Sequence, residues 1–427
     1  MLPERIKQLE VGIGPALAGS LLRESQYLFS YAADDPGQPA ISLLMPPSRM
    51  LYQDGDLFPS MDMNLPEGFL FQRILELHPK RTLNKMHLLA LAGHNAIGRV
   101  GFSLPGASPA APSATISKQS LLRSTQGPDL FDQLVAAYLS TGTGISGVQP
   151  KVMVPGRASL PVPNLIVKTA AAAYPGLAAN EYLCLSAARA AGLALPPFDL
   201  SDDGSLLVVD RFDLTEDGGR LGFEDVAALM GRRVHDRFSN RKYEGSYEAM
   251  AEAVGLFSAD RRADLARLFE QIALSIMVRN GDAHLKNFGL LYSSADDARV
   301  SPLFDVVTTT VYRYERSPGF EDVDRTLALR LRKGRHASRA YPDTAELHAF
   351  AREICGVAEP ARVLERIAQG MSEALSVAAH DERMPPALLA QMREQWALGM
   401  AHATQQAVVP RRRRSRRPPT AASGNTP

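Results

Sequence analysis

The sequence of 427 residues is poor in cysteine and has no long hydrophobic run. Its two cysteines, Cys184 and Cys355, are too few for a disulfide framework or a thiolate metal site, so we expect both to pack as small hydrophobic side chains. No stretch of about 18 apolar residues offers a membrane span. Residues 1–10 lack the basic stretch and apolar core of a secretory signal. We therefore expect a cytoplasmic protein without a membrane segment.

An excess of charge of one sign is also missing, since the net charge is +1. This balance hides an asymmetry, because residues 411–417 contain six arginines and the rest of the chain has 41 basic against 46 acidic residues. Prolines flank the arginines, and we expect residues 406–427 to form a disordered tail. Such a tail could bind the phosphates of a nucleic acid, or could simply be solvated.

Changes in composition along the chain indicate more than one domain, as its length also suggests. Residues 105–120 are rich in alanine, serine and proline, which indicates a linker, and we place a boundary near residue 112. Before this boundary, short apolar runs alternate with turn signals, and residues 68–77 and 84–91 have helical patterns. We therefore expect a small α+β module at the N-terminus.

After the linker, the pattern changes from mixed to mostly helical. Residues 130–139 have helical spacing, and residues 151–154 and 165–168 have the pattern of strands. Helices dominate after Phe223. In residues 264–279, the apolar positions recur at steps of three and four, which predicts a helix with one apolar face.

A glycine-rich segment at residues 142–147 matches the pattern G-x-G-x-x-G. A dinucleotide site would need a strand before these glycines and a helix after them. The predicted order is the reverse, as in a loop that covers the phosphates of ATP with backbone N–H groups. The segment therefore favours a phosphate-binding loop, and a glycine-rich turn without a ligand is the alternative.

Lys168 ends the apolar strand predicted over residues 165–168. A kinase needs a cation on a rigid strand to meet the α- and β-phosphates, and a carboxylate from a helix to hold that cation. Glu181 begins the next amphipathic segment and is the candidate partner. The spacing permits this pair but does not require it, because most such lysines are surface residues.

The strongest chemical signal is the segment 279–288, Arg-Asn-Gly-Asp-Ala-His-Leu-Lys-Asn-Phe. Asp282 and Asn287 have the spacing of a kinase catalytic loop, in which the aspartate accepts the proton of the attacking hydroxyl and the asparagine oxygen binds magnesium. A hairpin over residues 288–304 would return Asp305 to complete the metal site. His284 could contact a phosphate. A polar turn after a buried helix would not need this set of side chains.

Together these segments resemble the HipA family of bacterial serine/threonine kinase toxins, over residues 10 to 400. The motifs that carry the resemblance are Leu65–Gly68, Gly93–Asn95, Ile145–Lys151, Asn180–Tyr182, Val209–Asp213, Lys242–Glu244 and Asn280–Asn287. The resemblance implies an α+β, two-lobed protein-kinase-like fold of the phosphoinositide-kinase-like branch. Its parts would be an N-terminal module over 1–112, an ATP-binding small lobe over 113–214, a mostly helical catalytic lobe over 215–405 and the tail over 406–427.

The resemblance also implies roles for individual residues. Asp282 would be the catalytic residue, and Asn287 and Asp305 would bind Mg²⁺. The residues that bind ATP would be Ser146, Gly147, Val148, Gln149, Lys151, Lys168, Asp210, Phe212 and His284. In this set, Asp210 to Phe212 would form the hinge that meets adenine.

Partners are implied as well. Family members phosphorylate an aminoacyl-tRNA synthetase, most often the glutamyl enzyme, which halts translation and produces dormancy. A small helix-turn-helix antitoxin restrains them, and DNA could be bound through that complex and through the arginine tail. Family members usually carry an inhibitory phosphorylated serine where this chain has Gly144. Ser146 could take over as the phosphate acceptor.

Two other classes of protein stay open. A phosphotransferase that acts on a small molecule would share the chemistry of Asp282 and Asn287. A catalytically silent DNA-binding corepressor would agree with the arginine tail, but it has no need of Asp282, Asn287 and Asp305 together. A phosphohydrolase that uses His235 and Asp236 is not supported, because the other metal ligands of that class are missing at a suitable spacing.

Overall fold

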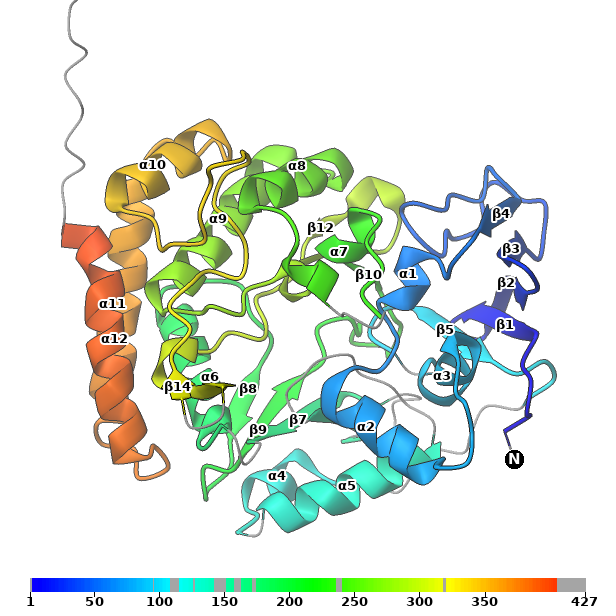
Figure 1. Cartoon of the computed structure of the whole chain (residues 1–427), viewed down its shortest axis with the longest axis horizontal. Helices are drawn as coiled ribbons and strands as arrows, with labels where there is room; N and C mark the ends of the chain where they lie inside the picture. Colours follow the sequence, from blue (N-terminus) through cyan, green and yellow to red (C-terminus); the bar gives the residue numbers. More distant parts are fainter. Residues whose placement is uncertain are drawn as a thin grey trace, which may run out of the picture.

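The computed structural model describes residues 2–94, 96–107, 115–125, 127–141, 151–156, 163–170, 174–235, 240–317 and 320–404 (Figure 1). The glycine-rich segment with Ser146, Gly147, Val148 and Gln149 lies outside the described residues, and so does the arginine tail. The phosphate-loop role of the first and the nucleic-acid role of the second therefore stay predictions.

The N-terminal module is built on a five-stranded antiparallel sheet with the strand order β4-β3-β2-β1-β5. Its strands are β1 Gln8–Ile13, β2 Ala16–Arg23, β3 Tyr27–Tyr31, β4 Leu51–Asp54 and β5 Val100–Ser103. Its helices are α1 Pro59–Asp62, α2 Gly68–Leu77 and α3 Lys85–Ala92. The two helices predicted from the sequence are confirmed. Asn84 caps α3 by accepting a hydrogen bond from the backbone N–H of His87 at 3.1 Å.

The small lobe has a four-stranded antiparallel sheet with the order β6-β7-β9-β8. Its strands are β6 Lys151–Val154, β7 Leu165–Thr169, β8 Phe198–Leu200 and β9 Leu206–Asp210, and its helices are α4 Lys118–Leu122, α5 Gly127–Thr141 and α6 Leu177–Ala190. Both predicted strands are confirmed. The register of β6 and β7 pairs Lys151 with Lys168, which puts the two ammonium groups on one face of the sheet.

The catalytic lobe is mostly helical, as predicted. Its helices are α7 Val226–Leu229, α8 Tyr247–Phe257, α9 Arg261–Met277, α10 Thr344–Glu353, α11 Pro360–Ala378 and α12 Pro386–Thr404, with short 3-10 turns η1 Asn240–Tyr243, η2 Leu285–Asn287, η3 Ala295–Asp297 and η4 Thr309–Val311. Its strands are β10 Gly222–Asp225, β11 Gly289–Tyr292, β12 Arg299–Val300, β13 Tyr314–Ser317 and β14 Phe320–Asp322. β11 and β12 form the predicted hairpin that leads to Asp305.

Helix α9 shows why the catalytic loop has a rigid support. The predicted apolar positions Leu265, Leu268, Phe269, Ile272 and Ile276 are all buried. The last two turns of the helix are buried all round, and α12 comes close to the helix end at Gly399, where a Cβ atom would lie 1.8 Å from the carbonyl oxygen of Met277. The predicted catalytic loop, residues 279–288, begins directly after this buried helix end.

The two apolar cores are separated by the small-lobe sheet. Leu206 and Val208 of β9 belong to a core that is shared with the N-terminal module, whereas Leu207 and Val209 belong to the core of the catalytic lobe. This alternation follows from the two-residue repeat of a strand. In Figure 1 the module lies on the right and the helices α11 and α12 form the left edge.

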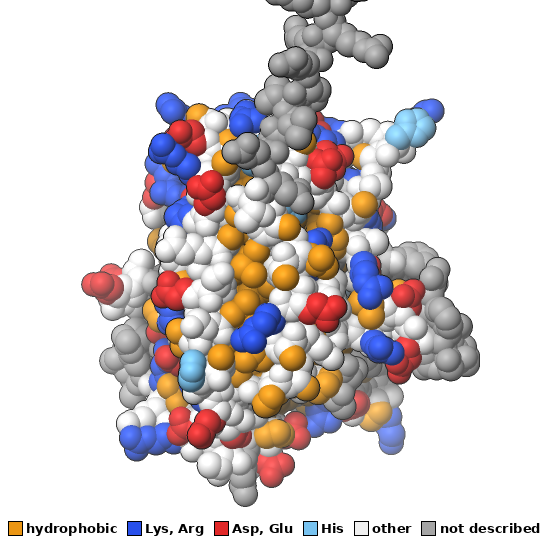
Figure 2. Space-filling view, turned by 90° about the vertical axis from the view of Figure 1, so that its left-hand side faces the viewer, with side chains coloured by type: hydrophobic (Ala, Val, Ile, Leu, Met, Phe, Trp, Pro, Cys, Tyr) orange, Lys and Arg blue, Asp and Glu red, His pale blue; other side chains and the backbone are white. Residues whose placement is uncertain are grey.

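The outer face of α11 and α12 carries apolar side chains down its middle, flanked by charged ones (Figure 2). Val377 of α11 and Leu398 of α12 are more than half exposed. Trp396 of α12 is buried, and its Nε1 donates to Thr308 Oγ1 at 2.8 Å, close in sequence to Asp305.

Cys184 and Cys355 are buried and free, as expected. Within the described part of the chain, no helix is long and apolar enough to cross a membrane.

Candidate active site

A cavity of about 630 Å³ is lined by residues of all three parts of the protein. The predicted site residues that line it are Lys151, Lys168, Phe212, Asp282, His284, Asn287 and Asp305. Two other predicted residues are not among its lining residues. Glu181 lies behind Lys168 and is buried, and the carboxylate of Asp210 accepts from Lys118 Nζ at 3.0 Å. The cavity therefore brings together seven of the predicted side chains.

The catalytic loop is held by hydrogen bonds to its own backbone. Asn280 Oδ1 accepts from the backbone N–H of Asp282 at 3.0 Å, and Asn287 Nδ2 donates to the carbonyl of Asp282 at 2.9 Å. Gly281 donates its N–H to Thr309 Oγ1 at 2.8 Å. A Cβ atom at this glycine would lie 2.7 Å from the carbonyl oxygen of Thr326, so only glycine fits there. Asp282 and Asn287 are thus fixed relative to each other.

Tyr243 contacts the predicted catalytic residue, although no role was predicted for it. Its hydroxyl donates to Asp282 Oδ1 at 2.6 Å. The ring of Tyr243 meets the ring of His284 edge-on, with 5.1 Å between the centroids. Burial lowers the pKa of His284 to about 4, so this side chain is neutral near pH 7. The family-like motif Lys242–Glu244 was the only sequence signal for Tyr243.

Lys168 and Asp305 form the centre of a first group of charges. Lys168 Nζ contacts Glu181 Oε1 at 2.5 Å and also Asp305, and Lys151 Nζ donates to Asp305 Oδ2 at 2.8 Å. Burial alone would raise the pKa of Asp305, but the charges of Lys151 and Lys168 hold it well below its ordinary value. Asp305 has a backbone φ of 54°, a left-handed conformation that is uncommon outside glycine and often marks a functional site. We call Lys151, Lys168, Glu181 and Asp305 the Asp305 cluster.

Aromatic rings provide an apolar part of the cavity. Phe212 and Phe304 are stacked, with 5.4 Å between their centroids and 28° between their planes. Phe223 meets both rings edge-on. Ile166 and Val209 from the small-lobe sheet line the same cavity. A flat apolar surface of this kind suits a planar base.

A second group of charges joins the N-terminal module to the catalytic loop. Glu67 Oε1 accepts from Lys286 Nζ at 2.6 Å, and Glu67 Oε2 accepts from Lys242 Nζ at 3.1 Å. Asp225 lies 3.9 Å from Lys286 Nζ. We call Glu67, Asp225, Lys242 and Lys286 the Glu67 cluster, and all four line the cavity. The motif Leu65–Gly68 was noted in the sequence, but a contact between residues about 175 to 219 positions apart could not be inferred from it.

The chemistry of Asn287 and Asp305 suits a magnesium ion. Both side chains offer oxygen donors, and both line the cavity. Magnesium is usually held by one or two protein oxygens and takes its other ligands from phosphates and water. No group of three or more His, Cys, Asp or Glu side chains that could hold a metal occurs among the described residues. A metal would therefore depend on Asn287, Asp305 and the bound phosphates.

Comparisons with known proteins show the fold and the family of the chain. HipA of Shewanella oneidensis MR-1, solved with HipB and its operator DNA, matches with a TM-score of 0.66 at 18% identity, over 92% of this chain and 96% of that chain. This likeness shows the two-lobed, kinase-like α+β fold. “Putative kinase Y4dM” of Sinorhizobium fredii is 30% identical over 34% of this chain and 38% of its own length. “Putative kinase Y4mE” of the same organism is 27% identical over 53% of this chain and 54% of its own length.

The chain thus spans about half or less of the length of these curated relatives. Family models cover both parts of the chain. Residues 9–103 match the HipA N-terminal domain, and residues 143–378 match the HipA-like C-terminal domain. The second match alone includes more than half of the chain and all the predicted site residues. The protein belongs to the HipA family.

Proposed function

We propose that this protein is an ATP-dependent kinase that transfers the γ-phosphate to a serine or threonine hydroxyl of another protein. The observation that carries the proposal is the convergence of Lys168, Asp282, Asn287 and Asp305 on one cavity. A structural ion pair would explain Lys168 and Glu181 but not the nearby Asp282 and Asn287. Phosphoryl transfer needs all of these groups within reach of one substrate.

The nucleotide would lie along the cavity between the small lobe and the catalytic loop. Its base would meet the apolar surface of Phe212 and Phe304, and its phosphates would meet Lys168 and Lys151. Magnesium, held by Asn287 and Asp305, would reduce the negative charge that an attacking oxygen must approach. The two lysines contact Asp305, so the phosphates would compete with this carboxylate for the ammonium groups.

Asp282 would act as the acid/base group. The Tyr243 hydroxyl donates to Oδ1, which leaves Oδ2 to accept the proton of the acceptor hydroxyl. The acceptor oxygen would then form a bond to the γ-phosphorus, while the bond from that phosphorus to the β,γ-bridging oxygen of ATP breaks and ADP leaves. The neutral His284 beside Asp282 is a candidate donor to a phosphate oxygen.

The biological role that we propose is that of a cytoplasmic toxin in a toxin–antitoxin pair. Its protein substrate would be an aminoacyl-tRNA synthetase, and a helix-turn-helix antitoxin would restrain it. Family membership supports this role, as does the solved relative, which was crystallised with HipB and operator DNA. Autophosphorylation of Ser146 and DNA contact through residues 411–417 are further parts of the proposal.

Phosphate transfer from radiolabelled ATP tests the function directly. The full chain, incubated with ATP, Mg²⁺ and a bacterial lysate, should label one protein of the size of an aminoacyl-tRNA synthetase. Asp282→Asn should lower the rate by roughly two to four orders of magnitude, because it removes the base. Release of ADP without a labelled protein would favour a small-molecule phosphotransferase. A wild-type rate in Asp282→Asn would contradict the assignment, and mass spectrometry of the labelled chain would test Ser146.

A further inference from the structure

Glu67 is a buried carboxylate that the N-terminal module presents to the catalytic lobe. It lies directly before α2, between Pro66 and Gly68. Gly68 has a φ of 53°, a backbone angle that glycine adopts without strain. The side chain of Glu67 is only 7% exposed, and both of its oxygens accept from lysines of the other lobe.

The two lysines lie beside the residues that hold the catalytic group. Lys286 belongs to the catalytic loop, four residues after Asp282, and its Nζ also donates to the carbonyl of Met63 in the module at 3.2 Å. Lys242 directly precedes Tyr243, whose hydroxyl donates to Asp282. Glu67 therefore contacts both chain segments that determine where the Asp282 carboxylate lies.

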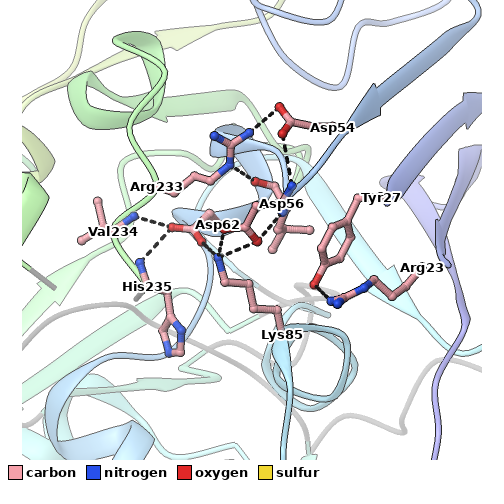
Figure 3. A network of polar contacts seen from close by, with 10 residues as sticks. Arg23, Tyr27, Asp54, Asp56, Asp62, Lys85, Arg233, Val234 and His235 are labelled. Atoms are coloured by element: carbon pink, nitrogen blue, oxygen red, sulfur yellow. Dashed lines mark hydrogen bonds and ion pairs between the residues drawn. The ribbon is translucent and has the colours of Figure 1, made fainter. Parts of the chain in front are cut away.

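The same module also fixes the chain a few residues before Tyr243. Asp62 Oδ2 accepts from the backbone N–H groups of Val234 at 2.6 Å and His235 at 3.0 Å, and Lys85 Nζ contacts Asp62 Oδ1 at 2.9 Å (Figure 3). Arg233 Nε donates to the carbonyl of Leu57 at 2.6 Å. The module thus holds residues 233–235 on one side and Lys242 on the other.

The carboxylate of Glu67 is needed to balance the charges of two neighbouring lysines. The side chains of Lys242 and Lys286 are only 4% and 8% exposed. Among the described residues, Glu67 is the only ion-pair partner of Lys242, while Lys286 has Asp225 as a more distant second partner at 3.9 Å. Two neighbouring buried ammonium groups repel each other unless a carboxylate lies between them. Without Glu67, both lysines are expected to turn towards water or towards other anions in the cavity.

We propose that Glu67 is a positioning residue of the catalytic centre, supplied by the N-terminal module, which keeps Asp282 and Tyr243 aligned through Lys286 and Lys242. This inference rests on the proposed kinase function for its kinetic consequences. It assigns the module a part in phosphoryl transfer, in addition to its apolar contact with the small lobe. The side chains of the Asp305 cluster pair with one another, so nucleotide binding should depend little on Glu67.

Glu67→Gln tests the proposal, because it keeps the size of the side chain and removes its charge. We expect kcat to fall by about tenfold or more, with KM for ATP changed by less than about threefold. Glu224→Gln is the matched control. Glu224 is also a buried carboxylate between the module and the catalytic lobe, accepting from Ser42 Oγ, the Leu43 N–H and Tyr292 Oη at 2.6 to 2.8 Å, but it does not line the cavity.

The control separates positioning from general loss of stability. In Glu224→Gln we expect a lower Tm but a kcat within about twofold of the wild-type value. Glu76→Gln, an exposed position on α2, should change neither quantity. A wild-type kcat in Glu67→Gln would overturn the proposal, and so would parallel losses of kcat and Tm in the Glu67 and Glu224 variants.

Hydrogen exchange gives a readout that does not depend on kinase activity. Amide exchange in residues 279–288 should be faster in Glu67→Gln than in the wild type and unchanged in Glu224→Gln. If the wild-type chain transfers no phosphate but this difference is found, the proposed function fails and the positioning role stands. Equal exchange in all three proteins would overturn the positioning role, whatever the kinase assay shows.

Discussion

The Asp305 cluster and the Glu67 cluster have the same composition but differ in the exposure of the carboxylate that their lysines share. Each has two lysines and two carboxylates, and in each one carboxylate is shared by both lysines. The shared carboxylate of the first, Asp305, is 24% exposed in the cavity, whereas that of the second, Glu67, is 7% exposed. The lysines of the first cluster come from the small lobe, and those of the second come from the catalytic lobe.

This difference suggests different tasks for two similar sets of charges. In the proposed mechanism, a bound phosphate would replace Asp305 as the partner of Lys151 and Lys168, because this carboxylate faces the cavity and would bind the metal ion instead. Glu67 is 7% exposed and is shared by Lys242 and Lys286, so we expect these lysines to stay paired with it during the reaction. We therefore expect the Asp305 cluster to exchange partners when a phosphate binds, and the Glu67 cluster to act as a fixed support.

The largest expected effect comes from removing the shared carboxylate of the Asp305 cluster. Asp305→Asn removes the carboxylate that both lysines share and one of the two proposed metal ligands. We expect the rate of phosphate transfer to fall by roughly two to four orders of magnitude. The fold should survive, because the side chain faces a polar cavity. Initial rates with radiolabelled ATP and a thermal melt check this, and a rate near that of the wild type would remove Asp305 from the mechanism.

The next largest effect is a loss of stability on replacing a lysine, and it should differ between the two clusters. Lys168→Met leaves Glu181, which is 1% exposed, without its only described ion-pair partner, and we expect a loss of about 3–5 kcal/mol in the free energy of unfolding. Lys242→Met should cost less, about 2 kcal/mol, because Glu67 keeps Lys286. Urea denaturation measures both values.

The double variant Lys168→Met/Glu181→Gln sharpens this comparison. Because it removes the unpaired carboxylate, it should regain most of the stability that Lys168→Met loses. If the double variant is less stable than Lys168→Met alone, the buried ion pair is not the cause of the loss.

The residues of the Asp305 cluster could be predicted from the sequence more fully than those of the Glu67 cluster, and the reason is physical. Asp282 and Asn287 could be predicted because their spacing is that of a kinase catalytic loop. The spacing of Lys168 and Glu181 only permitted their pairing, and the resemblance to a known family supplied their roles and that of Asp305. The positions of α2 and α9 were predicted because apolar periodicity determines them locally, whereas the β11–β12 hairpin was predicted from the need to return Asp305 to the metal site.

The Glu67 cluster could not be predicted in this way. The contacts of Glu67 with Lys242 and Lys286 join segments that are brought together only by the packing of the module on the catalytic lobe. The hydroxyl of Tyr243 reaches Asp282 for the same reason, across 39 positions in the sequence. A single sequence contains no periodicity or spacing that encodes such a side-chain contact, so these residues were visible only as motifs without a role.

A moderate effect is expected at the link between the second cluster and the catalytic group. Tyr243→Phe removes the hydrogen bond to Asp282 Oδ1 and leaves the ring against His284 in place. A hydrogen bond to a charged group contributes about 1.5–3 kcal/mol, so we expect kcat to fall by about ten- to a hundredfold. Tyr247→Phe is the control, because its hydroxyl donates to the carbonyl of Ala283 and not to the carboxylate. Equal losses in both variants would contradict a specific role of Tyr243.

The smallest expected effect concerns Asp225, the second carboxylate of the Glu67 cluster. Burial raises the pKa of Asp225 from 3.8 to about 6, and the charges of Glu67 and Asp62 add to this against the opposing charge of Lys286. Between these two values the folded protein keeps a proton that the unfolded chain has lost. Stability therefore falls as the pH rises from about 4 to about 6, and is constant above that range as far as Asp225 is concerned.

Asp225→Asn should remove this dependence while keeping the cap of α7, since the Asn side chain can still accept from the Ala228 N–H. The difference in unfolding free energy, wild type minus variant, should decrease from pH 4 to 6 and then level off. Asp381→Asn is the control, because the hydrogen bond from Arg383 lowers the pKa of Asp381 and moves its titration below this range. If the difference in unfolding free energy instead increases between pH 4 and 6, the attraction of Lys286 outweighs the effect of burial on Asp225. Both carboxylates of the Glu67 cluster would then be ionised, with one carboxylate for each lysine.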